Sequence, residues 1–462
     1  MSPRETVALR DYLGAGPSDR TLSDAAQSIA ITDLTHGTAL SGRLLELAGR
    51  SVLLSMATQL ITGAAMIEVD GIARQMLLCP PDLDIKHAPS LIADAGIDAI
   101  VTDDPARWQE FGVPLIVTAT LPLQPATPVE PTCTTNWLML TSGTTGRPKI
   151  VAHTLAALTG AIVGDNPADS AATPPTWATF YDIRRYGGLQ IFLRAVLGGA
   201  SMVLSSPGEA IADHLARLAA RGVTHISGTP SHWRKAMMSA AINQFHPNYV
   251  RLSGEISDQA VLDSLRKAFP HASIGHAYAS TEAGVGFAVN DGREGFPASL
   301  IGRSPSGVEM KVVDGSLRIK SSRAAHTYIG SAAPALTDAD GFVDTGDMVE
   351  LRDDRYYFVG RRDGIINVGG LKVHPEEVEA VINRHPSVRM SRIRARKSPI
   401  TGALVVADVM LASVSDAGRT GEIREAILAD CKRSLPPHKL PVMINFVDRL
   451  DVTASGKLAR HA

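Results

Sequence analysis

Short apolar runs alternate with amphipathic segments along the first part of the chain. From Ser51 onward, Val52–Leu54, Met66–Val69 and Ile97–Val101 read as strands, and the segment near Ala88–Ala95 reads as a helix. Strands that alternate with helices in this way are typical of α/β sheets. The pattern therefore predicts a β/α unit in this region.

The alternation returns after residue 200 and predicts a doubly wound sheet. Met202–Leu204 reads as a strand, and the helix after it places Ile211, Leu215 and Leu218 on one face. Further strands are expected at Val223–Ile226, Tyr249–Leu252 and Ser273–Tyr278, with helices from Thr229-Pro230 onward and from about Asp258 to Phe269. Ligands bind at the carboxyl ends of strands in such sheets. Those ends carry the small and polar segments Ser227-Gly228-Thr229, Ser253-Gly254-Glu255 and Tyr278-Ala279-Ser280-Thr281-Glu282.

The pattern changes beyond Gly302. Short strands separated by turns predict an all-β part, and the last hundred residues or so, a typical small-domain size, read as a separate α+β domain. That last part is expected to hold helices at Glu376–Asn383 and Glu422–Leu435 and strands at Leu404–Met410 and Val442–Val447. We therefore expect an α/β N-terminal domain over residues 1–362, with a small β subdomain, and a small α+β domain over residues 363–462.

A loop rich in glycine and hydroxyl residues lies between two strand-like runs, Leu138–Leu140 and Ile150–Ala152. Its glycines let backbone N–H groups approach an anion, its hydroxyls add hydrogen-bond donors, and its cations offset phosphate charge. The spacing Gly143-x-x-Gly146-x-Pro148-Lys149 does not match a Walker A loop, and a strand rather than a helix follows it. The loop is interpreted as a phosphate cradle, although surface turns use the same residues.

Composition narrows the class of protein. The chain has 462 residues, more than one hydrophobic core usually holds, and its net charge of −2 does not indicate a nucleic-acid binder. Its three cysteines lack C-x-x-C spacing, which argues against a disulfide framework or a cysteine zinc site and fits a reducing cytoplasm. The most membrane-like run, from Ser51 to Gly71, contains Gln59, Glu68 and Asp70, so we expect no membrane span.

Five separated motifs in one order resemble the adenylate-forming superfamily of acyl-CoA synthetases, nonribosomal adenylation domains and beetle luciferase. They are the loop from Thr141 to Lys149; Tyr278 to Glu282; Asp344-Thr345-Gly346-Asp347; Gly360-Arg361-Arg362-Asp363 with Gly369-Gly370 and Pro375-x-Glu377-x-Glu379; and Thr453-Ala454-Ser455-Gly456-Lys457. The resemblance runs from about Ser51 to Arg460. It implies a large N-terminal domain, a small mobile C-terminal domain, and an acid–thiol ligase that uses ATP, Mg²⁺ and CoA.

The resemblance also implies a role for each motif in forming an acyl-adenylate. Thr281 would donate a hydrogen bond to the α-phosphate, Glu282 would help to hold Mg²⁺, and Lys457 would be the adenylation lysine. Asp347 would accept hydrogen bonds from the ribose hydroxyls with Arg361 nearby, and Tyr278 would cover the adenine beside the Gly254-Glu255 backbone. The residues expected to hold the β- and γ-phosphates are Thr141, Ser142, Gly143, Thr144, Thr145, Gly146 and Lys149.

The second half-reaction is expected to need a rotation of the small domain about Asp363. This rotation would withdraw Lys457 and present Gly369 and Gly370, whose lack of side chains permits close passage of a pantetheine arm. Lys372 could contact the CoA phosphates, or it could be a solvated surface lysine. CoA is the first choice of acceptor, and a carrier-protein arm or a non-thiol nucleophile stays open.

The acyl substrate is the least defined part of the prediction. The resemblance places the acyl pocket around residues that are more polar than a long alkyl chain would favour: Tyr181, Asp182, Arg184, Arg185, Ser227, Trp233 and Gly284. An aromatic or functionalised carboxylic acid is therefore expected. The alternative for the charged run Tyr181–Gly188, which contains Asp182, Arg184 and Arg185, is that its side chains pair with each other or face solvent. A monomer or homodimer is expected, and the remote alternative to an enzyme is a non-catalytic nucleotide-binding protein.

Overall fold

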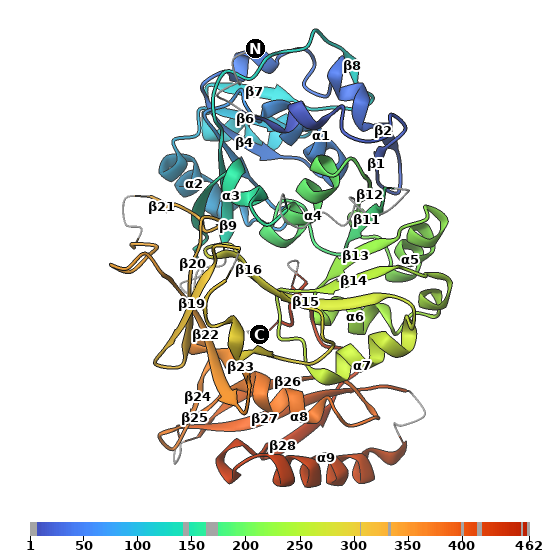
Figure 1. Ribbon diagram of the computed structural model, residues 1–462, viewed down its shortest axis with the longest axis vertical. Coiled ribbons are helices and arrows are strands. Elements are labelled where there is room, and N and C mark those ends of the chain that lie inside the picture. The colour runs from blue at the N-terminus through green and yellow to red at the C-terminus, as the bar shows by residue number, and fades with distance from the viewer. Residues whose placement is uncertain are drawn as a thin grey trace.

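The structure of the protein is a computed structural model, which describes residues 7–141, 147–162, 174–304, 306–330, 334–398, 402–413, 418–453 and 456–459. The chain is arranged as a stack of layers, with the N-terminal part at the top of Figure 1, the middle of the chain below it, and the C-terminal part at the bottom. The two large sheets lie in the upper and middle layers.

The first sheet lies in the upper part of the molecule and is mostly parallel. In spatial order its strands are β21 (Thr327–Ile329), β10 (Lys149–Thr154), β9 (Asn136–Thr141), β5 (Gln75–Leu78), β4 (Ser51–Ser55), β6 (Ala99–Thr102) and β7 (Leu115–Thr118). Strand β10 runs antiparallel to both β9 and β21. The glycine-rich loop therefore connects two adjacent antiparallel strands.

The second sheet has a parallel centre and antiparallel edges. Its strands in spatial order are β16 (Gly284–Val289), β15 (Ser273–Ser280), β14 (Tyr249–Leu252), β13 (His225–Gly228), β11 (Thr176–Thr179), β12 (Ser201–Val203), β1 (Thr21–Ser23) and β2 (Ser28–Ala30). Strands β13, β14 and β15 are in parallel register, so that Gly228, Leu252 and His276 lie side by side. The three polar segments predicted at the strand ends therefore leave the sheet at the same edge.

Helices α1 (Gln59–Val69) and α4 (Tyr186–Leu197) contribute to one hydrophobic core that joins the two sheets. All eleven residues of α1 are buried, as in a helix that is apolar on every side. The predicted strand at Met66–Val69 is therefore wrong, because these residues form the last turn of α1. A short apolar run does not distinguish a buried helix from a buried strand.

Other helices cover the outer faces of the two sheets. Helix α2 packs on the first sheet, and α5, α6 and α7 pack on the second. Their bounds, with that of the short α3, are α2 (Ala88–Ala95), α3 (Leu155–Thr159), α5 (Ile211–Ala220), α6 (Pro230–Ala236) and α7 (Gln259–Ala268). The predictions for α2, α5 and α7 are confirmed, and Thr229 caps α6 as expected, since its hydroxyl accepts a hydrogen bond from the His232 amide.

The β subdomain and the small domain complete the chain. The subdomain is a sheet of β17 (Phe296–Pro297), β23 (Arg355–Arg361), β22 (Val343–Arg352), β20 (Ser316–Lys320), β19 (Glu309–Val313) and β18 (Gly302–Arg303). The small domain holds β24 (Ile366–Val368), β25 (Leu371–Val373), α8 (Pro375–Ile382), β26 (Val388–Ser398), β27 (Gly402–Leu411), α9 (Thr420–Ser434) and β28 (Met443–Phe446). The predictions for α8, α9, β27 and β28 are confirmed, whereas the long strand β26 was not predicted.

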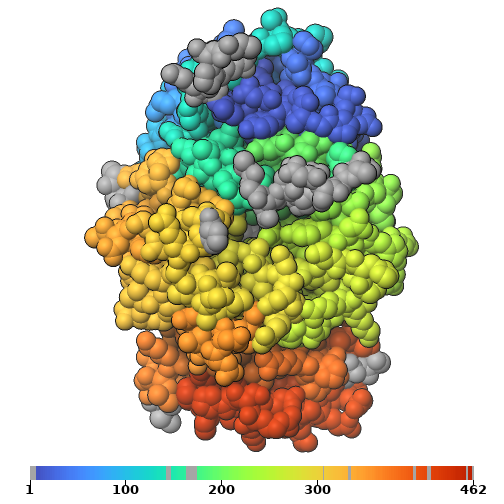
Figure 2. All heavy atoms as spheres, viewed as in Figure 1, coloured from blue at the N-terminus to red at the C-terminus, as the bar shows by residue number. Residues whose placement is uncertain are grey.

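The small domain packs against the rest of the molecule. In Figure 2 its atoms, orange to red, abut those of the β subdomain and the second sheet. On the surface, Arg384 after α8 lies 3.4 Å from the carboxylate of Glu294 in the larger part. The chain crosses between the two parts at the short 3-10 helix Arg362–Gly364, which includes Asp363. Among the described residues no helix is long and apolar enough to cross a membrane.

Candidate active site

The candidate site lies at the carboxyl edge of the second sheet, where β13, β14 and β15 end. Thr229 follows β13, Glu255 comes shortly after β14, and Thr281 and Glu282 follow β15. Neighbouring parallel strands in register bring these segments together. The β subdomain adds Asp347 and Arg361, and the small domain adds Lys457.

Asp347 and Tyr278 are directly linked. The Tyr278 hydroxyl donates a hydrogen bond of 2.6 Å to Asp347 Oδ2, and Arg361 Nε lies 3.7 Å from Asp347 Oδ1. Burial, together with the nearby Asp347 carboxylate, raises the pKa of Tyr278 well above its usual range. The tyrosine therefore stays a neutral donor and helps to fix the carboxylate.

The ring of Tyr278 also belongs to an aromatic group between the second sheet and the β subdomain. It is nearly parallel to Phe358 at 5.2 Å and to Phe287 at 5.7 Å between ring centroids. These contacts explain how the ring is held in one orientation. Its contact with an adenine stays a prediction.

Glu282 lies beside Tyr328, which comes from another segment of the chain and also contacts Lys149. The Tyr328 hydroxyl donates to Glu282 Oε1 at 3.3 Å, and Lys149 Nζ lies 5.5 Å from the centroid of the Tyr328 ring. Strand β21, which carries Tyr328, pairs with β10, which begins at Lys149. Tyr328 thereby lies between Glu282 and the end of the glycine-rich loop, and no local sequence pattern marks it as a site residue.

The glycine-rich loop is described only at its two ends. Thr141 and Lys149 are opposite each other in the register of β9 and β10, and Arg147 Nη2 lies 2.6 Å from Asp94 Oδ2 of α2. The predicted phosphate-binding residues Ser142, Gly143, Thr144, Thr145 and Gly146 lie outside the described residues. Their role stays a prediction.

His153 fixes the backbone at Thr281. Its Nε2 lies 2.7 Å from the Thr281 carbonyl oxygen, and because a carbonyl only accepts, Nε2 carries the proton. Burial lowers the pKa of His153 to about 4, so the ring is neutral at neutral pH. The sequence analysis did not identify His153, because its contact joins residues that are 128 positions apart.

Lys457 reaches the same place from the small domain. A β-carbon built on Gly254 would lie 3.8 Å from Lys457 Cε, and the lysine side chain keeps contact with solvent. The pKa of Lys457 lies below its usual value, mainly because the ammonium group is partly removed from water. The Glu255, Asp347 and Glu282 carboxylates act in the opposite direction and raise this pKa, whereas Arg361 lowers it. The lysine side chain thus lies beside Gly254, whose backbone was predicted to lie next to the adenine.

The charged residues predicted for the acyl pocket are largely paired with other protein groups. Arg184 is buried and donates from Nε and Nη2 to the two carboxylate oxygens of Asp182 at 2.7 and 2.6 Å. Arg185 donates to Asp82 at 2.5 Å. The Arg184–Asp182 pair agrees with the alternative that these side chains pair with each other, whereas Arg185 pairs with Asp82, which lies outside the run.

The other predicted pocket residues fall into two groups. Tyr181 adjoins Gly254, where an added β-carbon would lie 3.9 Å from Tyr181 Cε1, and its hydroxyl donates to the Ser253 carbonyl at 2.6 Å. Trp233 is fully buried in the core, where its ring contacts Phe180, and Ser227 is also buried. Gly284 has a φ of +74° and leaves no room for a β-carbon beside the Arg323 carbonyl. Tyr181 is therefore the predicted pocket residue that contacts the site most directly.

The residues predicted for the second half-reaction lie on the surface of the small domain. Gly369, Gly370 and Lys372 are exposed in and beside the turn between β24 and β25. Both glycines have positive φ values, 59° and 86°, which glycine adopts without strain. Lys457 is thus at the strand ends, while these residues face solvent.

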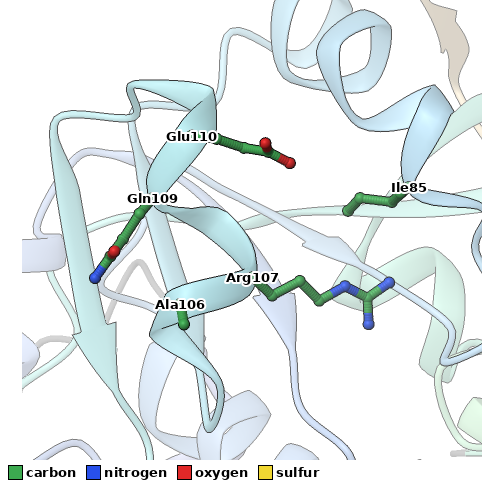
Figure 3. A pocket seen from close by; sticks show the side chains of 5 residues that line it. All are labelled: Ile85, Ala106, Arg107, Gln109 and Glu110. Atoms are coloured by element: carbon green, nitrogen blue, oxygen red, sulfur yellow. The ribbon is translucent and has the colours of Figure 1, made fainter.

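Two other features do not define the site. A surface hollow near the 3-10 helix Pro105–Phe111, lined by Ile85, Ala106, Arg107, Gln109 and Glu110 (Figure 3), contains none of the motif residues. Within the described residues no group of three or more histidine, cysteine or acidic side chains could hold a metal ion. The role of Glu282 in holding Mg²⁺ stays a prediction.

The layered core, the β subdomain and the small domain that delivers a lysine to the strand ends define an adenylate-forming ligase. The chain belongs to the AMP-binding enzyme family. The model for AMP-binding enzymes matches residues 72–323, and the model for the C-terminal domain of these enzymes matches residues 377–457.

Similar proteins support this class. The 2-succinylbenzoate–CoA ligase of Listeria innocua is 26% identical over 73% of this chain and 73% of its own length. The mitochondrial acyl-coenzyme A synthetase ACSM4 of Rattus norvegicus is 26% identical over 70% of this chain, which spans only 60% of that relative's length. A benzoate CoA ligase from Burkholderia xenovorans LB400 has the same fold, with a TM-score of 0.78 at 19% identity over 98% of this chain and 99% of that one.

Proposed function

We propose that the protein activates a carboxylic acid with ATP and transfers the acyl group to the thiol of CoA. In the first step a carboxylate oxygen attacks the α-phosphorus of ATP, pyrophosphate leaves, and an acyl-adenylate forms. In the second step the thiolate attacks the acyl carbonyl and AMP leaves. The observation that carries this proposal is the position of Lys457, which comes from the small domain and lies against Gly254, with its flanking peptide groups bonded to Thr229 and Glu255 at the strand ends.

Different site residues would contact different parts of the ATP molecule. Lys457 would neutralise the charge that develops between the carboxylate and the α-phosphate, where a fixed cation stabilises the transition state. Asp347, held by Tyr278 and near Arg361, would accept hydrogen bonds from the ribose hydroxyls. Thr141 and Lys149 flank the loop that would hold the β- and γ-phosphates.

Glu282 would help to hold a magnesium ion when a nucleotide is bound. Mg²⁺ keeps several waters and is commonly bound by one or two carboxylates together with substrate phosphates. Glu282 supplies one partly accessible carboxylate, and its contact with Tyr328 engages only one oxygen. When bound, the ion would neutralise phosphate charge.

The acid is proposed to be aromatic. Tyr181 and His232 lie next to Gly254 and Gly456, with their ring centroids 5.8 Å apart, and Phe180 lies 5.6 Å from His232. Flat side chains of this kind suit a flat substrate. The relatives named for 2-succinylbenzoate and benzoate support the same choice.

CoA is the proposed acceptor, and the two steps are proposed to use two orientations of the small domain. The segment 362–364 would be the hinge, and the domain boundary would lie between residues 362 and 363. The turn with Gly369 and Gly370 would face the site only after the small domain has rotated. A carrier-protein arm or another nucleophile stays the alternative acceptor.

The first experiment is carboxylate-dependent exchange of labelled pyrophosphate into ATP, without CoA, over a library of acids. We expect exchange with aromatic acids such as benzoate and little exchange with long alkanoates. CoA, a carrier protein or a simple amine is then added to the best acid, and the product is identified by mass spectrometry. Absence of exchange with every acid, despite tight ATP binding, would support the non-catalytic alternative.

A further inference from the structure

The peptide groups on both sides of Lys457 are bonded to the large domain. The Thr229 hydroxyl donates to the Gly456 carbonyl oxygen at 2.5 Å, and the Leu458 amide donates to Glu255 Oε1 at 2.7 Å. The partners are separated by 227 and 203 positions in the sequence, so these bonds report how the small domain docks.

Glu255 is itself held in place by the start of α6. Its Oε2 accepts the Ser231 amide at 2.9 Å, and its Oε1 accepts the Ser231 hydroxyl at 3.0 Å. The Glu255 carboxylate therefore reaches Leu458 from a fixed position. A carboxylate that accepts several N–H and O–H bonds makes stronger bonds than a neutral acceptor.

Thr229 is similarly fixed. Its hydroxyl oxygen accepts the His232 amide at 3.0 Å as the cap of α6, which leaves the hydroxyl hydrogen to donate to Gly456. The Thr229 amide donates to His232 Nδ1 at 3.2 Å. The Thr229 side chain thus both caps α6 and binds the segment Gly456–Leu458, which we call the lysine loop.

Gly456 lies directly against the His232 ring. It has a φ of +77°, and a β-carbon there would lie 1.8 Å from His232 Cε1. A larger residue would push the lysine loop away from α6. The close approach explains why glycine precedes the lysine.

The loop is also held on the side of the small domain. The Thr453 amide donates to the Lys457 carbonyl at 2.7 Å, and Leu458 packs with Met390 and Met410. These contacts would travel with the small domain, whereas the contacts to Thr229 and Glu255 would break when it rotates.

We propose that Glu255 and Thr229 form a clamp that positions Lys457 for the first half-reaction. By fixing the Gly456 carbonyl and the Leu458 amide, the clamp sets the direction in which the lysine side chain leaves the backbone. Glu255 and Thr229 are positioning residues, since they act through Lys457. The inference rests on the proposed function for its kinetic consequence, but the clamp itself is measurable without turnover.

The kinetic test compares the two half-reactions in Glu255→Ala and Thr229→Val. A misplacement of about 1 Å can cost about 10²-fold, so we expect the kcat of adenylation to fall by up to about that factor. In Thr229→Val, thioester formation from presynthesised acyl-adenylate should stay within about threefold of wild type, because Lys457 is withdrawn in that step. Thr229→Ser keeps the hydroxyl and should restore most of the adenylation rate.

The second measurement is hydrogen–deuterium exchange of the Leu458 amide in the complete, ligand-free protein. A hydrogen bond to a charged group is worth about 1.5–3 kcal/mol, so Glu255→Ala should speed this exchange by about tenfold or more. Arg384→Gln is the control, because it removes the exposed contact with Glu294 and should change neither half-reaction nor this exchange by more than about threefold.

Each result has a distinct meaning. Unchanged exchange at Leu458 in Glu255→Ala, or an equal loss in both half-reactions in a Thr229→Val protein with wild-type melting temperature, would overturn the clamp. If wild type formed no adenylate with any acid, the proposed function would fail, and the exchange experiment would still confirm or overturn the clamp.

Discussion

Two segments of the small domain are predicted to act in catalysis, and they are in opposite situations. The loop of Lys457 is bonded on both sides to the large domain, whereas the turn with Gly369 and Gly370 faces solvent. A β-carbon built on Gly370 would meet no atom within 4 Å. The difference agrees with our proposal that this orientation would serve adenylate formation and that thioester formation would require the small domain to turn.

The strongest way to test this comparison is to remove the docked lysine. Lys457→Ala should reduce adenylate formation by about 10²–10³-fold, the usual cost of losing one transition-state donor or cation. It should leave thioester formation from presynthesised acyl-adenylate largely intact. Measurement of the two half-reactions separately checks this, and an equal loss in both would contradict a division of labour between the two segments.

The second test blocks the proposed rotation. Asp363→Pro fixes φ at the hinge and restricts Arg362 before it. Adenylate formation should continue while thioester formation falls by about tenfold or more, which corresponds to at least about 1.4 kcal/mol of barrier. Rapid-quench analysis should show adenylate accumulating. If both steps slowed alike, Asp363 would be an ordinary structural residue.

The third test concerns the exposed turn. Lys372→Ala should raise the KM for CoA by about two- to fivefold, as expected for one exposed ionic contact of about 0.5–1 kcal/mol. Pyrophosphate exchange should not change, because it needs no CoA. An unchanged KM for CoA would instead identify Lys372 as a solvated surface lysine.

The smallest effect is expected at Arg185, whose pairing with Asp82 is partly exposed. Arg185→Ala should lower stability by less than about 1 kcal/mol. It should also leave the preference among acids with and without a polar substituent within about twofold of wild type. Comparison of kcat/KM for matched acids checks this, and a tenfold change in preference would return Arg185 to the acyl pocket.

The sequence predicted the local features of the molecule well. Thr229 caps α6, and the segments after β13, β14 and β15 meet at one edge of the sheet, because both features depend on nearby residues and on parallel pairing. The residues that hold the site in place were not predictable in this way. His153 and Tyr328 contact Thr281 and Glu282 across 128 and 46 positions, and no local pattern marks them.

The errors also have physical reasons. Met66–Val69 reads as a strand because helix α1 is buried on every side and shows no polar face. The role of Asp182, Arg184 and Arg185 in substrate recognition stays a prediction, and both arginines have protein partners elsewhere in the fold, the Met56 carbonyl and Asp82. Burial and pairing of charges depend on the tertiary structure and cannot be seen in a run of residues.

The central claim is that the protein forms an acyl-adenylate, and the fate of ATP in a single turnover tests it most directly. ATP labelled in the α-phosphate is mixed with enzyme, Mg²⁺ and an accepted acid, first without CoA. The account predicts that the label appears in enzyme-bound acyl-adenylate with release of pyrophosphate, and that added CoA converts it to free AMP together with a stoichiometric amount of thioester. Formation of ADP, or of thioester without prior adenylate, would contradict the account.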